Sequence, residues 1–154
     1  MKSIQKVFGM TDEVWDKHSN PWSVWTRFAS LPFLILAFWS AHHIGIYSLI
    51  PILILVAWLW INPRLFSRPN TQESWASKAV LGEKIWINDR DSRIIKKHST
   101  VVRFSTAISF IGFLFLIRSV YAQDVTMCLL STIILYTGKM WFLDRMVWVY
   151  EDKK

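Results

Sequence analysis

The chain has 154 residues, of which 18 are Lys or Arg and 11 are Asp or Glu, so its formal net charge is +7. Apolar types make up 53% of the residues, which excludes an intrinsically disordered chain. Cys128 is the only cysteine, and this excludes a disulfide-stabilised scaffold. Residues 28–63 contain no charged side chain. An uncharged run of this length predicts a membrane protein rather than a soluble domain.

The uncharged run is too long for one crossing. As a single helix its 36 residues would extend about 54 Å, whereas the hydrocarbon core of a bilayer is about 30 Å thick. The polar cluster at 42–45, His-His-Ile-Gly, is the natural place for the chain to turn back. We therefore predict two membrane spans, at 22–40 and 44–61.

Two further spans are predicted in the second half of the chain. Fourteen uncharged residues follow Arg103, and fourteen precede Lys139. Apolar flanks extend these segments to 100–118 and 124–143, with the long side chains of Arg103 and Lys139 reaching the interface. A soluble core hairpin is the alternative, but a window of about 19 residues over either segment is hydrophobic enough to favour spanning.

The positive charges predict the orientation. With a cytoplasmic amino terminus, four crossings place both termini and the 62–99 segment inside, together with 17 of the 18 Lys and Arg residues. Only Arg118 then lies outside. We expect a multi-pass protein of the cell inner (cytoplasmic) membrane. Its fold class is an all-α membrane protein, a single polytopic domain over 1–154 with a bundle of four transmembrane helices and an amphipathic helix on the cytoplasmic face. The first 21 residues contain no apolar stretch typical of a signal peptide.

The segment before the first span holds two candidate site residues. Thr11 is suited to cap a short helix whose first turn is acidic. Trp22 belongs to an expected interfacial belt of tryptophans. His18 and Asn20 are candidates for ligand contact. The alternatives are an interfacial hydrogen-bonding role for His18 and an Asn-Pro turn at Asn20.

The 62–99 segment is predicted to contain the amphipathic helix. Asn70 and Glu73 resemble a capping box, which predicts a helix from there through about Asn88. Its apolar arc includes Trp75 and Trp86.

Glu83 lies near the centre of this apolar arc. Burial of a carboxylate without a partner costs several kcal/mol, so Glu83 is expected to be either paired or functional. Arg90 is its nearest helical partner if the helix continues. An ion pair that tethers the helix to another helix is the structural alternative.

The end of the last helix carries a polar and aromatic stripe. Thr137, Trp141, Asp144, Trp148 and Glu151 are spaced by four, three, four and three residues, so they share one helical face. Two carboxylates and two indoles on one face are typical of a polar pocket. The alternative is that they anchor the helix at the interface and pair with the basic loop.

Several functional classes are excluded or disfavoured by the motifs. Four histidines cannot supply the histidine boxes of membrane di-iron desaturases, and the sequence has no zinc-protease, phosphate-loop or serine-elbow motif. We therefore predict no metal site and identify no cofactor. Anionic lipid headgroups explain the basic run at 90–103 better than nucleic acid does. Ser105, Ser109 and Gly112 form a small-residue face suited to close helix packing, within the chain or in a homo-oligomer.

Three stretches resemble a known family. They are HSNPWSVWTR at 18–27, NPRLF at 62–66 followed by SWASKAVLGE at 74–83, and MWFLDRMVW at 140–148. In these residues the chain resembles an uncharacterised prokaryotic family of small multi-pass membrane proteins. The family has no established activity, so the resemblance implies the topology and no reaction.

The leading hypothesis is a cytosol-facing interfacial pocket that binds or acts on a lipid- or isoprenoid-like amphiphile. The candidate catalytic residues are Glu83 and Asp144, as acid/base or ion-binding groups, and His18, which with Asn20 orients the ligand. An oligomeric channel or transporter is one alternative, and a structural or accessory membrane subunit is another. The predicted partners are membrane lipids and the amphiphile. The candidate binding residues are Asn20, Trp22, Asn62, Trp75, Trp86, Trp141, Trp148 and Glu151.

Overall fold

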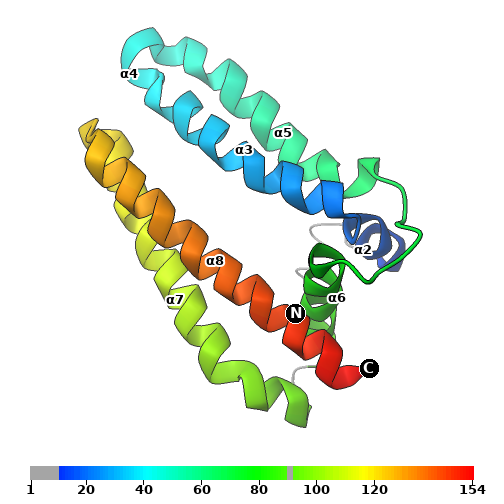
Figure 1. The fold of residues 1–154 in the computed structure, drawn as a ribbon. Coiled ribbons are helices and arrows are strands. Elements are labelled where there is room, and N and C mark those ends of the chain that lie inside the picture. The colour runs from blue at the N-terminus through cyan, green and yellow to red at the C-terminus, as the bar shows by residue number, and fades with distance from the viewer. Residues whose placement is uncertain (1–10, 90–91) are drawn as a thin grey trace.

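The computed structural model describes residues 11–89 and 92–154, and the regular structure of these residues is entirely helical (Figure 1). Three stretches of this described part are long and apolar enough to cross a membrane, namely Pro21–Leu65, Arg93–Ala122 and Val125–Lys153. The predicted all-helical fold is therefore confirmed, and these stretches suggest a membrane protein. The elements in chain order are α2 (Asp12–His18), α3 (Pro21–Trp39), α4 (Ala41–Ile44), the 3-10 helix η1 (Gly45–Ser48), α5 (Leu49–Leu65), α6 (Trp75–Asn88), α7 (Arg93–Ala122) and α8 (Val125–Lys153).

The first membrane-length stretch is folded into a hairpin. Helices α3 and α5 lie side by side and antiparallel, joined by α4 and η1 (Figure 1). The chain reverses at the predicted polar cluster, where Gly45 has a φ of +55°, a conformation that glycine adopts without steric cost. At the other end, the Asn20 side chain accepts a hydrogen bond from the Trp22 amide at 3.0 Å, and Pro21 occupies the first turn of α3.

The second hairpin pairs α7 with α8 along their length (Figure 1). Two glycines allow this close approach. A Cβ atom on Gly112 would lie 2.6 Å from the Leu135 nitrogen, and one on Gly138 would lie 2.5 Å from the Ser109 nitrogen. The small-residue face predicted at Ser105, Ser109 and Gly112 therefore packs within the chain, against α8.

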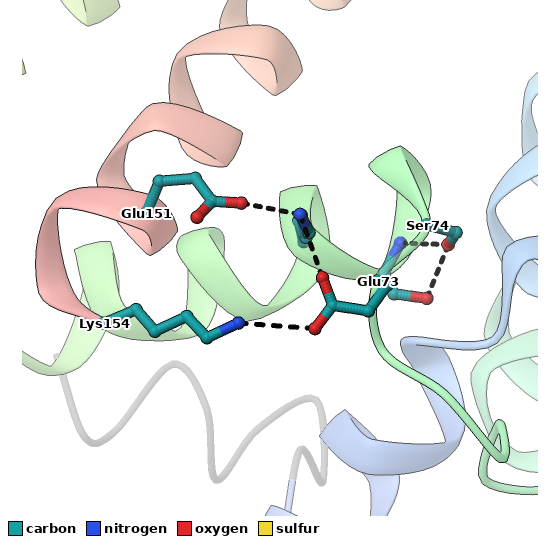
Figure 2. Close-up of polar contacts among 6 residues, drawn as sticks. Glu73, Ser74, Glu151 and Lys154 are labelled. Carbon is teal, nitrogen blue, oxygen red and sulfur yellow. Dashed lines mark hydrogen bonds and ion pairs between the residues drawn. The ribbon is translucent and has the colours of Figure 1, made fainter.

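Helix α6 begins later than predicted. Its N-cap is Ser74, whose side chain accepts a hydrogen bond from the Ser77 amide at 3.1 Å. The predicted capping box at Asn70 and Glu73 is wrong, because Glu73 instead pairs with Lys78 at 3.2 Å and with Lys154 at 3.3 Å (Figure 2). Glu73 was predicted to cap its own helix, but its carboxylate links the start of α6 to the end of α8.

Helix α6 is packed between α2 and α8. Against α8, a Cβ atom on Gly82 would lie only 1.9 Å from the Met146 carbonyl oxygen. Against α2, the fully buried Ser77 hydroxyl donates to the Ser19 carbonyl at 2.6 Å. Lys78 bridges from α6 to Glu151 near the end of α8 at 2.6 Å (Figure 2). These contacts fix α6 across the ends of the two hairpins.

Candidate functional site

A cavity of about 540 Å³ lies where the two hairpins meet α2 and α6. Six helices contribute to its lining. Its lining residues are Trp15 and His18 of α2; Val24, Arg27, Phe28, Leu31 and Leu34 of α3; Leu59, Trp60, Pro63 and Arg64 of α5; Val80, Glu83 and Ile87 of α6; Ser109 of α7; and Leu135, Tyr136, Lys139 and Leu143 of α8.

The lining changes from polar to apolar along the hairpins. Arg27 lies two turns closer to α2 than Leu34 does, and seven helical residues separate two positions by about 10 Å. Leu59 and Leu135 line the cavity on α5 and α8, and the charged residues of these helices follow them in sequence. The charged side chains therefore gather at the end of the cavity nearest α2 and α6. Leu34, Leu59 and Leu135 lie toward the end directed along the hairpins, whereas Leu143 lies beyond Lys139 at the polar end.

His18 is held at the polar end by a directed chain of hydrogen bonds. Its Nε2 atom lies 3.0 Å from Nη1 of Arg27, and its Nδ1 atom lies 2.9 Å from the Ser23 hydroxyl. A guanidinium can only donate, so Nε2 accepts and Nδ1 carries the hydrogen. The Ser23 hydroxyl in turn donates to Oδ1 of Asn62 at 2.8 Å. The imidazole is thus fixed in one neutral tautomer.

Burial lowers the pKa of His18 from 6.5 to about 3, and the positive charges of Arg27 and Lys139 add to the effect. The imidazole is therefore neutral at physiological pH. Both ring nitrogens are occupied by protein partners, so this residue is suited to orienting its neighbours.

Asn62 connects α3 and α5 beside the cavity. It is fully buried, and its Nδ2 atom donates to the Thr26 hydroxyl at 2.8 Å while its Oδ1 atom accepts from Ser23. Asn20 makes a second link near the same end, through a 3.0 Å hydrogen bond from its Nδ2 atom to the Ser67 carbonyl. Both asparagines were predicted as binding residues, and neither lines the cavity.

Glu83 lines the cavity from α6 and attracts Arg27 electrostatically. Within residues 11–89 and 92–154, its carboxylate forms no ion pair or hydrogen bond. The predicted partner Arg90 lies outside the described residues. Glu83 and His18, which the sequence predicted as site residues from separate segments, therefore meet at one cavity.

The predicted tryptophans lie outside the cavity lining. Trp75 stacks on Trp25 with ring centroids 5.9 Å apart and packs on the core cluster of Trp15. Trp86 packs on the second core cluster, which includes Met146. Trp22 is exposed on α3.

The predicted stripe on α8 is an exposed face. Trp141, Asp144, Trp148 and Glu151 are all exposed, and none of them lines the cavity. Instead, α8 turns Leu135, Tyr136, Lys139 and Leu143 toward it. Glu151 pairs with Lys78 (Figure 2). This ion pair agrees with the alternative in which the stripe anchors the helix and pairs with cations of the 62–99 segment.

Two cations of the cavity were not among the predicted site residues. Arg27 and Lys139 lie at the ends of predicted spans, and Lys139 was expected to extend to the interface. The structure places both side chains in the lining of the cavity, and Lys139 is also exposed there. A charged residue near a membrane boundary often faces the interior of a bundle, and this tendency is the signal that could have identified them.

The chain belongs to a family of unknown function, DUF6653, because a model of this family matches residues 2–154. Membership in an uncharacterised family, expected from the three quoted stretches, is thereby confirmed. No curated protein and no solved structure matches the chain significantly.

Proposed function

We propose that this protein crosses the cytoplasmic membrane four times and holds a lipid- or isoprenoid-like amphiphile in the cavity between its hairpins. Helix lengths support four crossings. The 19 residues of α3 and the 17 residues of α5 give helices of about 28 Å and 26 Å, close to the hydrocarbon thickness of about 30 Å. The antiparallel arrangement of these helices supports two crossings within Pro21–Leu65.

The orientation follows from charge. Both hairpins turn at the end remote from α6, and Arg118 is the only Lys or Arg near those turns. Among the described residues, the cationic side chains of the 62–99 segment, of α2 and of the end of α8 belong to the other end, which we therefore place in the cytoplasm. The polar end of the cavity then faces the cytoplasmic leaflet.

The proposal rests on the change from charged to apolar lining residues along the cavity. A pocket with charged groups at one end and leucines at the other matches a molecule that has a polar headgroup and an apolar tail. Its volume of about 540 Å³ is within the range of small-molecule sites, about 300–1,000 Å³. Glu83 and the neutral His18 would lie beside the headgroup, with His18 orienting Arg27. Asp144 has no place in this proposal because it lies outside the cavity.

The proposal is tested by filling the apolar end of the cavity. We expect wild-type protein purified in a mild nonionic detergent to retain one amphiphile, detected by native mass spectrometry. Leu59→Trp places a larger side chain in the cavity and should lower this occupancy at least fivefold.

Leu53→Trp is the matched control, because Leu53 lies on the same helix and is 63% exposed. It should retain the wild-type occupancy. Equal occupancy in wild type and Leu59→Trp, with both variants folded by circular dichroism, would contradict the proposal.

A further inference from the structure

The polar end of the cavity has an excess of positive charge. Arg27, Arg64 and Lys139 are cationic, and Glu83 is the one carboxylate among the described lining residues. His18 stays neutral there because its Nε2 atom accepts a hydrogen bond from Arg27. A headgroup in this place would therefore meet more cations than anions.

Two of these cations lack a carboxylate partner. Arg27 donates to the neutral His18 imidazole, and Nζ of Lys139 lies 4.7 Å from the centre of the Phe142 ring. Neither forms an ion pair with any residue in 11–89 or 92–154. By contrast, Lys78 and Lys84 of α6 both pair with carboxylates, at 2.6 Å and 2.8 Å. Arg27 and Lys139 thus differ from these lysines of α6 in having no carboxylate partner among the described residues.

The lining also contains two buried polar atoms without a hydrogen-bond partner in the described part of the chain. They are Nε1 of Trp15, a side chain only 5% exposed, and the Ser109 hydroxyl. Buried polar groups are nearly always satisfied, so unpaired ones indicate a missing partner. An indole N–H can only donate, which means that its missing partner is an acceptor.

We infer that the amphiphile carries a phosphate-class anionic headgroup, bound at the polar end by Arg27 and Lys139. This inference rests on the proposed function and names the ligand class of that same cavity. Phosphate oxygens are acceptors that a guanidinium binds bidentately, and an ammonium contributes a point charge. Glu83 attracts Arg27 and opposes an anion, so its charge limits the affinity.

The test compares three probes on the full chain in nonionic detergent. Dioctanoyl phosphatidic acid and dioctanoylglycerol have the same tails and differ in the phosphate, whereas inorganic phosphate has no tail. We expect the phosphatidic acid to bind at least tenfold more tightly than either of the others. Arg27→Gln and Lys139→Gln should each reduce its affinity at least fivefold, and Glu83→Gln should increase it.

Arg103→Gln and Glu13→Gln are the matched controls, because both residues are exposed and lie outside the cavity lining. Both should keep the wild-type affinity. Circular dichroism identifies any variant that fails to fold. If Arg27→Gln fails to fold, the affinity of Lys139→Gln for phosphatidic acid tests the inference.

Two outcomes overturn the inference and separate it from the proposed function. If both dioctanoyl probes bind equally and Leu59→Trp abolishes both, the cavity holds an amphiphile but does not select phosphate. If inorganic phosphate binds as tightly as the phosphatidic acid, the polar end is a site for a free anion. Dioctanoyl binding that Leu59→Trp leaves unchanged would instead contradict the proposed function itself.

Discussion

Gly82→Ala should destabilise the protein by about 3 kcal/mol. In a helix interior, a change from Gly to Ala normally stabilises by about 1 kcal/mol, because alanine has the better helix propensity. Here the added methyl group would lie 1.9 Å from the carbonyl oxygen and 2.6 Å from the carbonyl carbon of Met146. Both atoms belong to the backbone of α8, so no side-chain rotation relieves the clash. Overpacking of this kind costs typically about 1–3 kcal/mol and sometimes more.

The consequence extends to the cavity. Val80, Glu83 and Ile87 are on the same helix as Gly82, so movement of α6 away from α8 displaces three lining residues together. We expect both a lower unfolding midpoint and loss of the retained amphiphile. Thermal unfolding in detergent measures the first effect, and native mass spectrometry measures the second.

Ala107→Val is the control for this experiment, because it adds carbon atoms at an exposed position of α7. It should shift the unfolding midpoint little. A Gly82→Ala protein as stable as wild type would show that α6 and α8 are not in the close contact described.

Acidification below pH 6.5 should destabilise the protein through His18. The folded state binds a proton at this imidazole only near pH 3, because burial lowers its pKa to about 3, whereas the unfolded chain binds one near pH 6.5. Unfolding therefore takes up a proton between these values. The contribution of His18 to the free energy of unfolding does not change with pH above about 6.5. Between pH 6.5 and about 3, it falls by about 1.4 kcal/mol for each pH unit.

His18→Gln removes the titration and keeps a side chain that can accept from Arg27 and donate to Ser23. The comparison is made between pH 7 and pH 4.5. The carboxylates whose pKa values are lowered by neighbouring lysines, such as Asp12 and Glu73, are present in both proteins, so their contribution cancels in the comparison. Wild type should lose stability more steeply than His18→Gln. Parallel pH profiles would contradict the buried, neutral state of His18.

Local signals in the sequence predicted the helices and the turn between the first two. Residues 28–63 contain no charged residue to end a span, so the polar cluster at 42–45 was the natural turn, and the chain reverses there. Thr11 was predicted as a cap from its position before two acidic residues, and its hydroxyl does accept from the Val14 amide. Such features depend on neighbours within a few residues.

The lining of the cavity depends on contacts between distant segments. Helical spacing correctly placed Trp141, Asp144 and Trp148 on one face, but it could not show that this face is exposed. In a membrane protein the lipid-facing and buried surfaces are equally apolar, so periodicity does not tell them apart. Arg27 and Lys139 were missed for the same reason. Glu83 was found because a carboxylate in an apolar arc is unusual in any environment.

The membrane topology is tested most directly by labelling single cysteines in intact cells, starting from a Cys128→Ser background. His43→Cys and Tyr121→Cys place a thiol at the two exposed turns, and Ser67→Cys places one in the exposed loop before α6. If the chain crosses the membrane four times and the polar end of the cavity faces the cytoplasm, a membrane-impermeant maleimide should label His43→Cys and Tyr121→Cys in intact cells. It should label Ser67→Cys only after permeabilisation. Rapid labelling of Ser67→Cys in intact cells, or no labelling of either turn, would contradict this topology.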